Sequence, residues 1–493
     1  MEITLAQLGI GSADLIAAFL FMFGLHRMSS PVSAPSGIRL AGVGMVLAVL
    51  ASFLSALTVS VAAQAYLPAN LGLAVIALLV GGSLAWWAGR TVAMTAMPQM
   101  VAIYNGLGGG AAAAIAAIAL LGGQTTVSRG HGLDIQATGD LTVTLLGGLI
   151  GAISLSGSVI AWAKLDGLLK QPVRFRGQQL CNGLVAITML GMAGVLIANA
   201  QGGPTDLPAS ATALVLFFAL ALLVGVLMTL PIGGADMPVV ISIFNAFTGL
   251  AVGLEGFVLQ NPALMIAGMV VGAAGMLLTL LMAKAMNRSV SSVVFSNFGE
   301  PSRRKPGAIK GSLKPMAPAD AGIAMRYAAS VIIVPGYGLA AAQGQGKLFE
   351  LVKMLQAGHV SVKFAIHPVA GRMPGQMDVL LAEAGVPYDM IFQLEDINDQ
   401  FAGTDVALVI GANDVVNPAA RTDKSSPIFG MPILNADLAK KVFVIKRGEG
   451  KGYAGVVNAL FYADNCSMVY GDAQAVLVQM IEAIRGLGLP NAA

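Results

Sequence analysis

The apolar positions of this chain follow two patterns, one before and one after about residue 290. In the first part, nine stretches each have the about 20 largely apolar residues that a helix needs to cross a bilayer. In the second part, six short apolar runs alternate with stretches in which apolar residues recur at helical spacing. The first pattern predicts an α-helical polytopic membrane bundle. The second predicts an α/β domain with a doubly wound parallel sheet.

The patterns also predict where the elements and domains begin and end. Residues 287–320 are basic, rich in Pro, Ser and Gly, and without a period, which is typical of a linker. We therefore expect a membrane domain over 1–288, a linker over 289–320 and an α/β domain over 321–493. The predicted spans are 4–24, 38–60, 70–89, 98–121, 141–163, 180–199, 210–230, 238–259 and 263–284. The predicted strands are 330–334, 360–366, 389–393, 405–410, 441–446 and 467–470.

Charge divides along the same line. Only 11% of the residues are charged, against about 25% in a typical soluble protein. Residues 1–290 hold ten Lys and Arg, and nine of these lie in the loops after spans one, three, five and nine. Because basic loops stay in the cytoplasm, these loops and the α/β domain are predicted to lie there. The net charge of +3 does not point to nucleic acid, and the two cysteines form no metal-binding spacing.

Polar residues inside the predicted spans are few, and each is a candidate for function because burying it in lipid is costly. Asp14 lies in the first span, Asn105 in the fourth and Asn245 in the eighth, with Asp236 just before the eighth and Glu255 near its outer end. Asn105, Asp236 and Asn245 could line a hydrated path. They could equally form hydrogen bonds between helices, or, for Asp236, cap a helix.

The stretch "VPGYGLAAAQGQ" (334–345) follows an apolar run and precedes a helical pattern. Gly336, Gly338 and Ala341 match the dinucleotide-binding fingerprint of a Rossmann-like fold. There the first residue makes the tight turn, the second admits the pyrophosphate, and the third packs the helix on the strand.

The residues after the second predicted strand favour NADP over NAD. An NAD site usually has an acid about 20 residues after the fingerprint, to bind the ribose 2′-hydroxyl. No acid lies between Glu350 and Asp378. Cations for a 2′-phosphate are available at Arg372 and in "KRGEGKGY" (446–453), which opens with Lys446 and Arg447.

Two further loops follow strands four and six, at the sheet edge where ligands bind. They are "GANDVVNPAA" and "GDAQ". Their Asp and Asn side chains could bind ribose or the nicotinamide amide, or could cap the helices that follow.

Taken together, these stretches resemble one family. The chain is similar, almost from end to end, to the proton-translocating nicotinamide nucleotide transhydrogenases, and most of all to their beta subunit. The motifs are "PGYGLAAAQGQ", "HPVAGRMPGQMDVLLAEAGVPYD", "EDIN", "VIGANDVVNPAA", "IFGMPIL", "KRGEGKGYAGV" and "GDA" in the α/β part, and "GGADMPVVIS" and "KAMNRS" in the membrane part.

The resemblance implies reversible hydride transfer between NAD(H) and NADP(H), coupled to proton translocation across the cell inner membrane. This chain would bind NADP(H). One or more alpha subunits would bind NAD(H) and add membrane helices, and the alpha-beta unit would form a dimer in the lipid. Asp414 would lie beside the nicotinamide as the catalytic residue. The implied cofactor-binding residues are Gly336, Tyr337, Gly338, Ala341, Val369, Ala370, Gly371, Arg372, Met373, Pro374, Gly411, Ala412, Asn413, Asp414, Val415, Gly430, Met431, Lys446, Arg447, Gly448, Glu449, Gly450, Lys451, Gly452, Tyr453, Asp472 and Ala473.

One departure concerns the proton path. Some family members carry a histidine in the fourth span, after a motif "MT-x-MP", where this chain has Asn105 in "MTAMPQMVAIYNG". Asn does not titrate. The titrating group then comes from a partner helix, or a water chain with Asp236 carries the proton.

Two other functions would also join a membrane part to a nucleotide-binding domain. A nucleotide-gated channel or transporter should show a carbonyl filter such as "TVGYG" between spans, and the membrane part has none. A membrane-anchored NADPH-dependent reductase would not require nine spans.

Overall fold

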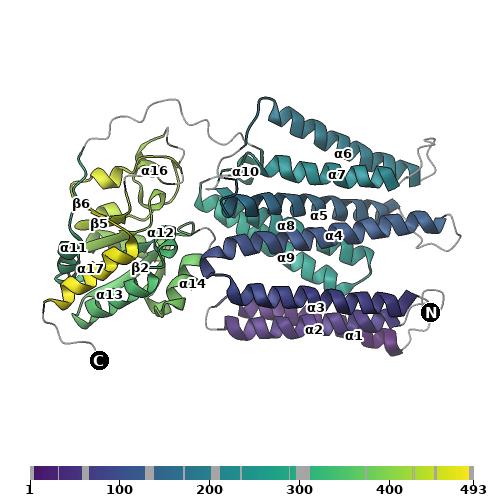
Figure 1. Ribbon diagram of the computed structural model, residues 1–493, viewed down its shortest axis with the longest axis horizontal. Helices are drawn as coiled ribbons and strands as arrows, with labels where there is room; N and C mark the ends of the chain where they lie inside the picture. Colours follow the sequence, from purple (N-terminus) through teal and green to yellow (C-terminus); the bar gives the residue numbers. More distant parts are fainter. Residues whose placement is uncertain are drawn as a thin grey trace. The chain divides into compact units, whose positions relative to one another are not determined.

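The computed structural model divides into two units (Figure 1). One comprises Met1–Pro231 and Val240–Leu278, and the other comprises Ile232–Val239 and Thr279–Ala493. The residues described are 5–30, 33–57, 66–127, 138–169, 173–200, 211–233, 236–287, 289–295, 311–371, 375–424, 426, 428–448, 452 and 454–487.

Nine of the described helices have the length and apolar composition that crossing a membrane requires, which confirms the number of predicted spans. The chain is therefore a multi-pass membrane protein. The helices are α1 (Leu5–Arg27), α2 (Ala34–Leu57), α3 (Leu67–Thr91), α4 (Met97–Val127), α5 (Thr138–Leu165), α6 (Gln178–Ala200), α7 (Ala211–Thr229), α8 (Met237–Val258) and α9 (Pro262–Ala285).

Glycines allow these helices to pack with their backbones in contact. A Cβ atom built on Gly151 of α5 would lie 2.5 Å from the carbonyl oxygen of Gly109 in α4. A Cβ atom on Gly249 of α8 would lie 2.6 Å from the Cα of Gly272 in α9. Small residues at such crossings are the usual means of helix association in lipid, where apolar burial alone gives no net attraction between helices.

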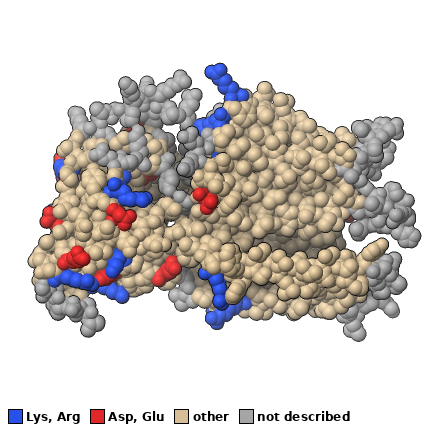
Figure 2. Space-filling view, in the orientation of Figure 1, with Lys and Arg blue, Asp and Glu red and all other residues tan. Residues whose placement is uncertain are grey.

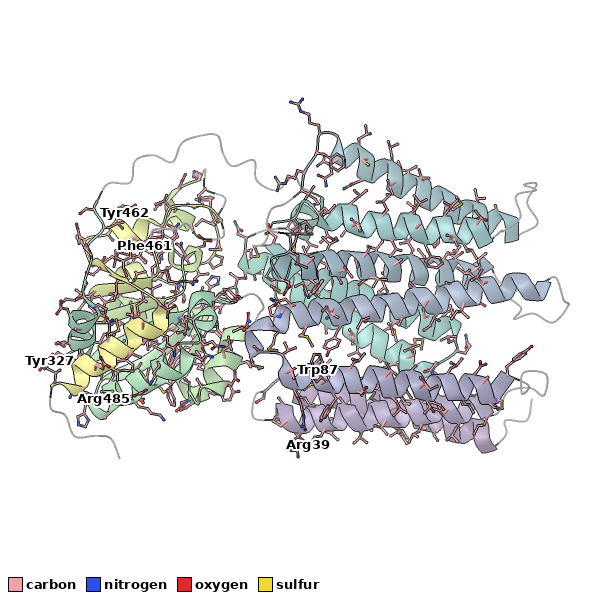
Figure 3. The ribbon with its side chains drawn as sticks, viewed as in Figure 1. Arg39, Trp87, Tyr327, Phe461, Tyr462 and Arg485 are labelled. Carbon is pink, nitrogen blue, oxygen red and sulfur yellow. The ribbon has the colours of Figure 1, made fainter. Side chains whose placement is uncertain are left out.

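The apolar surface of α3 is left open by the described residues of this chain. None of the described residues of α3 is buried, and Trp86 and Trp87 are each 61% exposed. Trp87 is labelled in Figure 3. An apolar surface of this extent requires lipid or the helices of another chain to cover it.

The second unit contains a six-stranded sheet in which every strand pair is parallel. The strand order is β3-β2-β1-β4-β5-β6, which confirms the predicted doubly wound sheet. The order reverses between β1 and β4, and open α/β sheets bind ligands at the carboxyl ends of the strands at such a point. The strands are β1 (Ser330–Pro335), β2 (Ser361–Ile366), β3 (Ile391–Gln393), β4 (Val406–Ile410), β5 (Lys441–Lys446) and β6 (Cys466–Tyr470).

The two faces of the sheet are covered differently. Helices α11 (Pro318–Arg326), α13 (Gln345–Ala357) and α17 (Ala473–Arg485) pack together over one face (Figure 1). Glu350 of α13 and Arg485 of α17 form an ion pair of 2.5 Å. Figure 3 labels Arg485 on α17. Short helices and loops cover the other face, where Phe401, Leu434 and Leu460 join the buried core.

The end of the predicted linker extends the sheet. Pro315 forms a parallel bridge with Met468 of β6, and Met468 N donates to Lys314 O at 2.7 Å. Residues 314–316 therefore cover an edge strand whose amides would otherwise be open to another chain.

Charged side chains are unevenly distributed over the surface. In Figure 2 they are scattered over the α/β unit, whereas most of the described surface of the helical unit has none. Three basic residues of the helical unit, Arg27, Arg90 and Lys164, lie in the last turns of α1, α3 and α5.

Candidate functional site

The loops after β1 and β4 meet at the carboxyl edge of the sheet, where the strand order reverses. Gly336 N donates to Ile410 O at 2.9 Å, and Gly338 N donates to Gly411 O at 3.0 Å. These bonds continue the sheet beyond the ends of β1 and β4, so the two loops are held in fixed positions beside each other.

Both loops require glycine at this meeting point. Gly411 has a φ of +72°, which favours a residue without a side chain. A Cβ atom on Gly336 would lie 2.7 Å from the Cα of Ala412, and one on Gly338 would lie 2.7 Å from the Cα of Gly411. The glycines therefore serve the close approach of the two loops as well as the turn itself.

The helix after the glycine turn is short. Helix α12 (Tyr337–Ala341) has 5 residues, and the amphipathic α13 begins only at Gln345. Ala341, at the third fingerprint position, is exposed. In the usual fingerprint, the third residue packs between the helix and the strand. Ala341 does not, because α12 ends at this residue.

His367 anchors the loop after β2 and was not among the predicted site residues. Its Nδ1 accepts from Val369 N at 3.1 Å, so Nε2 carries the proton and donates to Pro432 O at 2.7 Å. The side chain is 2% exposed, and burial lowers the pKa of His367 to about 4. The loop that follows reaches the glycine turn, since Tyr337 N donates to Ala370 O at 3.0 Å.

Asp414 joins the loop after β4 to the segment after β5. Its Oδ2 accepts from Ala454 N at 2.9 Å, and a Cβ atom on Gly452 would lie 2.6 Å from its Cγ. The structure thus brings Gly452 and Asp414, two of the predicted site residues, together.

Asn417 and Asn458 strengthen this junction and were also missed as site residues. Asn417 Nδ2 donates to Val457 O at 3.2 Å, and the side chain is completely buried. Asn458 Nδ2 donates to Asn413 O at 2.9 Å. Asn417 belongs to the motif "GANDVVNPAA". Its hydrogen bond to Val457 spans 40 residues, and a contact at that separation leaves no periodic pattern in the sequence.

Lys446 and Arg447 place positive charge at the carboxyl end of β5. Lys446 Nζ lies 4.5 Å from the ring centroid of Phe461 (Figure 3), and Arg447 is exposed. Lys446 O also accepts from Gly471 N at 3.0 Å, which brings the loop after β6 to the same edge.

Other predicted contact residues have structural positions of their own. Asp472 Oδ1 accepts from Gln474 N at 3.1 Å and caps α17, the alternative that the sequence left open. Val415 and Met431 are buried in apolar clusters, and Gly430 has a φ of +79°. Seven predicted residues lie outside the described residues: Arg372, Met373, Pro374, Glu449, Gly450, Lys451 and Tyr453.

The helical unit contains a buried cluster of hydrogen-bonded polar groups. Asn105 Nδ2 of α4 donates to Ile241 O of α8 at 3.1 Å, and Thr248 Oγ1 donates to Asn105 O at 2.9 Å. Ser154 Oγ of α5 lies 2.6 Å from Thr248 Oγ1 and donates to Phe244 O at 3.0 Å. The cluster joins three helices, and Ser154 and Thr248 were not predicted as members.

Asn245 and Asp236 have other surroundings. Asn245 is half-buried, and its backbone lies against Gly275 of α9 rather than in the cluster of Asn105. Asp236 directly precedes α8 and is 5% exposed.

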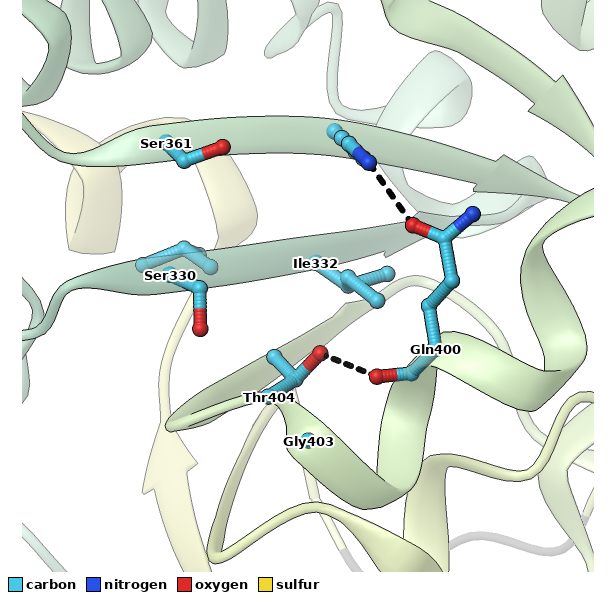
Figure 4. A pocket seen from close by; sticks show the side chains of 8 residues that line it. Ser330, Ile332, Ser361, Gln400, Gly403 and Thr404 are labelled. Atoms are coloured by element: carbon cyan, nitrogen blue, oxygen red, sulfur yellow. Dashed lines mark hydrogen bonds between the residues drawn. The ribbon is translucent and has the colours of Figure 1, made fainter.

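A small pocket lies at the opposite ends of the strands. It has a volume of about 210 Å³ and is lined by the first residues of β1 and β2 together with Gln400, Gly403 and Thr404 (Figure 4). Lys363 Nζ donates to Gln400 Oε1 there at 2.7 Å, so its cation is already hydrogen-bonded. Ligands of open parallel sheets bind at the carboxyl ends, so this pocket is not the candidate site.

The chain is similar to known proteins over almost its whole length. The family described as NAD(P) transhydrogenase beta subunit matches residues 10–483. Two curated relatives from Rhodospirillum rubrum, both called NAD(P) transhydrogenase subunit beta, are 45% identical to it over 477 residues. This alignment covers 96% of this chain and 98% of each relative. The chain therefore belongs to the NAD(P) transhydrogenase beta subunit family.

Proposed function

We propose that this chain binds NADP(H) at the carboxyl edge of its sheet and conducts protons through its helical bundle. It acts with an alpha subunit that binds NAD(H) and supplies further membrane helices. The functional domains are 1–288 for proton conduction, 289–320 as the linker and 321–493 for NADP(H). The α/β domain lies in the cytoplasm and the bundle in the inner membrane, as a dimer of the alpha-beta unit surrounded by lipid.

The observation that carries this proposal is the meeting of the loops after β1, β2 and β4 beside the switch point of the sheet. His367 stands at the end of β2 where an NAD site usually has an acid, and it is neutral at pH 7. No carboxylate there repels a 2′-phosphate, and Lys446 and Arg447 can bind one. These residues therefore fit NADP(H).

Hydride transfer needs no acid or base from the side chains of this chain. NADPH, when bound, supplies the hydride. The glycine loops of this chain hold the cofactor, and Asp414 fixes Gly452 and Ala454 against the loop that carries it. The domain presents the nicotinamide to the alpha subunit and excludes water from the transfer.

The proton path follows the buried polar cluster. Asn105, Ser154 and Thr248 supply hydroxyl and amide groups for a hydrated route, and Asp236 supplies a carboxyl group at the start of α8. A proton that moves across about 100 mV releases about 2.3 kcal/mol. We infer that this free energy alters NADP(H) affinity through the linker. A nucleotide-gated channel, the alternative function, is not favoured by the family to which the chain belongs.

The test is to reconstitute the chain with an alpha subunit in vesicles and to follow hydride transfer from NADPH to an NAD analogue together with internal pH. We expect transfer accompanied by proton movement, and binding of NADPH without transfer when the alpha subunit is left out. Hydride transfer with no change of pH would instead indicate a membrane-anchored reductase.

A further inference from the structure

Glu255 is a buried carboxyl group that the proposed path does not yet use. It lies three residues before the end of α8 and is 0% exposed. Among the described residues, neither of its carboxyl oxygens has a hydrogen-bond partner. An ionised carboxylate without partners is very costly to bury, so the carboxyl group is in its protonated form in this state.

The chain makes room for this carboxyl group on the neighbouring helix. A Cβ atom built on Gly147 of α5 would lie 3.1 Å from the Cδ of Glu255. Any other residue at position 147 would therefore displace the carboxyl group. The same Cβ atom would lie 3.4 Å from the Cβ of Leu254, an apolar residue beside Glu255 on α8.

Glu255 lies on the same seam between α5 and α8 as the polar cluster. Thr248 precedes Glu255 by seven residues on α8, and Ser154 follows Gly147 by seven on α5. Seven residues are two helical turns, a rise of about 10 Å on each helix. The contact of Ser154 with Thr248 and that of Gly147 with Glu255 are thus two positions of one antiparallel seam.

A small residue of α8 lies between the two positions. Ala251 lies one turn before Glu255 on α8 and is 0% exposed. On α5, Gly151 lies between Gly147 and Ser154 in the sequence and faces Gly109 and Ala112 of α4. At this level, α8 therefore presents a small side chain rather than a large one.

Few other charged or titratable groups are available to Glu255. On the helices packed against it, the charged residues are Asp140 in the first turn of α5, Lys164 in its last turn and Lys284 in the last turn of α9. Tyr104 of α4 is 44% exposed, and α7 has no charged residue. Asp140 precedes Gly147 by two turns and is half-buried, so it lies between Glu255 and the nearer end of the bundle.

We propose that Glu255 is a proton-binding group at the end of the bundle opposite to Lys164. It takes up a proton from the water at the Asp140 end, forming an O–H bond on its carboxylate. It then releases that proton along the seam to the cluster of Thr248, Ser154 and Asn105. The proposal rests on the proposed function, because it assumes that protons cross this bundle. It also supplies a titrating group within this chain, which Asn105 cannot be.

The test compares the complete alpha-beta complex in vesicles for the wild type, Glu255→Gln, Glu255→Asp and Leu250→Gln. Leu250 is 48% exposed on the same helix, so Leu250→Gln places the same amide away from the seam as a control. We expect proton movement to fall by at least about tenfold in Glu255→Gln, because the relay loses its titrating group. Glu255→Asp should retain much of the movement, and Leu250→Gln should retain all of it.

A second readout does not depend on activity. The infrared spectrum of the wild type should contain the carbonyl band of a protonated carboxylic acid that is missing in Glu255→Gln and shifted in Glu255→Asp. If the wild type moves no protons, the proposed function fails, and the infrared band still decides whether Glu255 binds a proton. If the wild type moves protons and Glu255→Gln moves them equally well, or if the two spectra are the same, the assignment of Glu255 is wrong.

Discussion

At the scale of the single residue, the neutral side chain of His367 holds two loops near the candidate site in place. Both ring nitrogens are engaged, one as an acceptor and one as a donor, and both partners belong to loops near the candidate site. Protonation would remove the acceptor that binds Val369 N and would place a charge in an apolar interior. His367 therefore fixes the loop that the glycine turn contacts.

This arrangement makes the stability of the α/β domain depend on pH. The pKa of His367 is lowered from 6.5 to about 4, so between these values the unfolded chain binds a proton that the folded chain does not. The free energy of unfolding then decreases as pH falls from 6.5 to about 4, by about 1.4 kcal/mol per pH unit. Hydrogen exchange of the sheet amides, measured on the full chain at several pH values between 6.5 and 4, should show this decrease in the free energy of unfolding.

The control for this prediction is the other histidine of the domain. His359 is exposed and has a φ of +63°, a conformation that Asn tolerates. His367→Asn should remove the pH dependence between 6.5 and 4, whereas His359→Asn should leave it in place. An unchanged slope in His367→Asn would show that another group is responsible.

At the scale of the element, β5 carries a lysine at each end, and the two should differ in function. Lys446 lies at the carboxyl end, beside the candidate site, and Lys441 lies at the amino end, at the opposite edge of the sheet. Both are on the same strand, so replacing either one removes the same charge from the same element.

We expect Lys446→Ala to weaken NADPH binding by about tenfold or more, because a hydrogen bond to a charged group contributes about 1.5–3 kcal/mol. Lys441→Ala should bind NADPH as the wild type does. Titration calorimetry on the full chain measures the affinity of each variant for NADPH and for NADH. The weak binding of NADH should change little in either variant. Equal losses in both variants would show that the 2′-phosphate is not bound at this end of β5.

The elements themselves could be predicted, and their side-chain pairings could not. The run 330–334 predicts β1 (Ser330–Pro335) almost to the residue, because a buried parallel strand is continuously apolar. The run 389–393 is less accurate: only 391–393 form β3, because Tyr388–Met390 make a 3₁₀ turn instead. Asn458 is 45 residues from its partner Asn413, and Thr248 is 143 residues from Asn105. Such pairs arise from topology, which local patterns do not encode.

At the scale of the whole molecule, the proposed function requires that proton binding in the membrane domain (1–288) and NADP(H) binding in the α/β domain (321–493) influence each other. Thermodynamic coupling is reciprocal, so a change that alters proton occupancy must alter NADP(H) affinity by the same free energy. Asp236, which directly precedes α8, carries a carboxyl group of the proposed path.

We expect Asp236→Asn to reduce proton movement and to slow NADPH release together, because the substituted residue cannot change its charge. Asp166→Asn is the matched control, since Asp166 is an exposed acid just after the end of α5. Vesicle pH and NADPH release rates measure the two effects. Normal proton movement together with normal NADPH release in Asp236→Asn would exclude this residue from the coupling.

The shortness of α12 has a consequence for the medium in which the protein works. A long helix would present fixed amide dipoles to a diphosphate, but five residues provide little of that field. Under the proposed function, attraction for the phosphates of NADP(H) then depends on cationic side chains such as the exposed Arg447. Dissolved ions shield exposed side chains much more effectively than buried groups. NADP(H) affinity in this protein should therefore respond to ionic strength, which makes salt concentration a variable to control in every binding measurement.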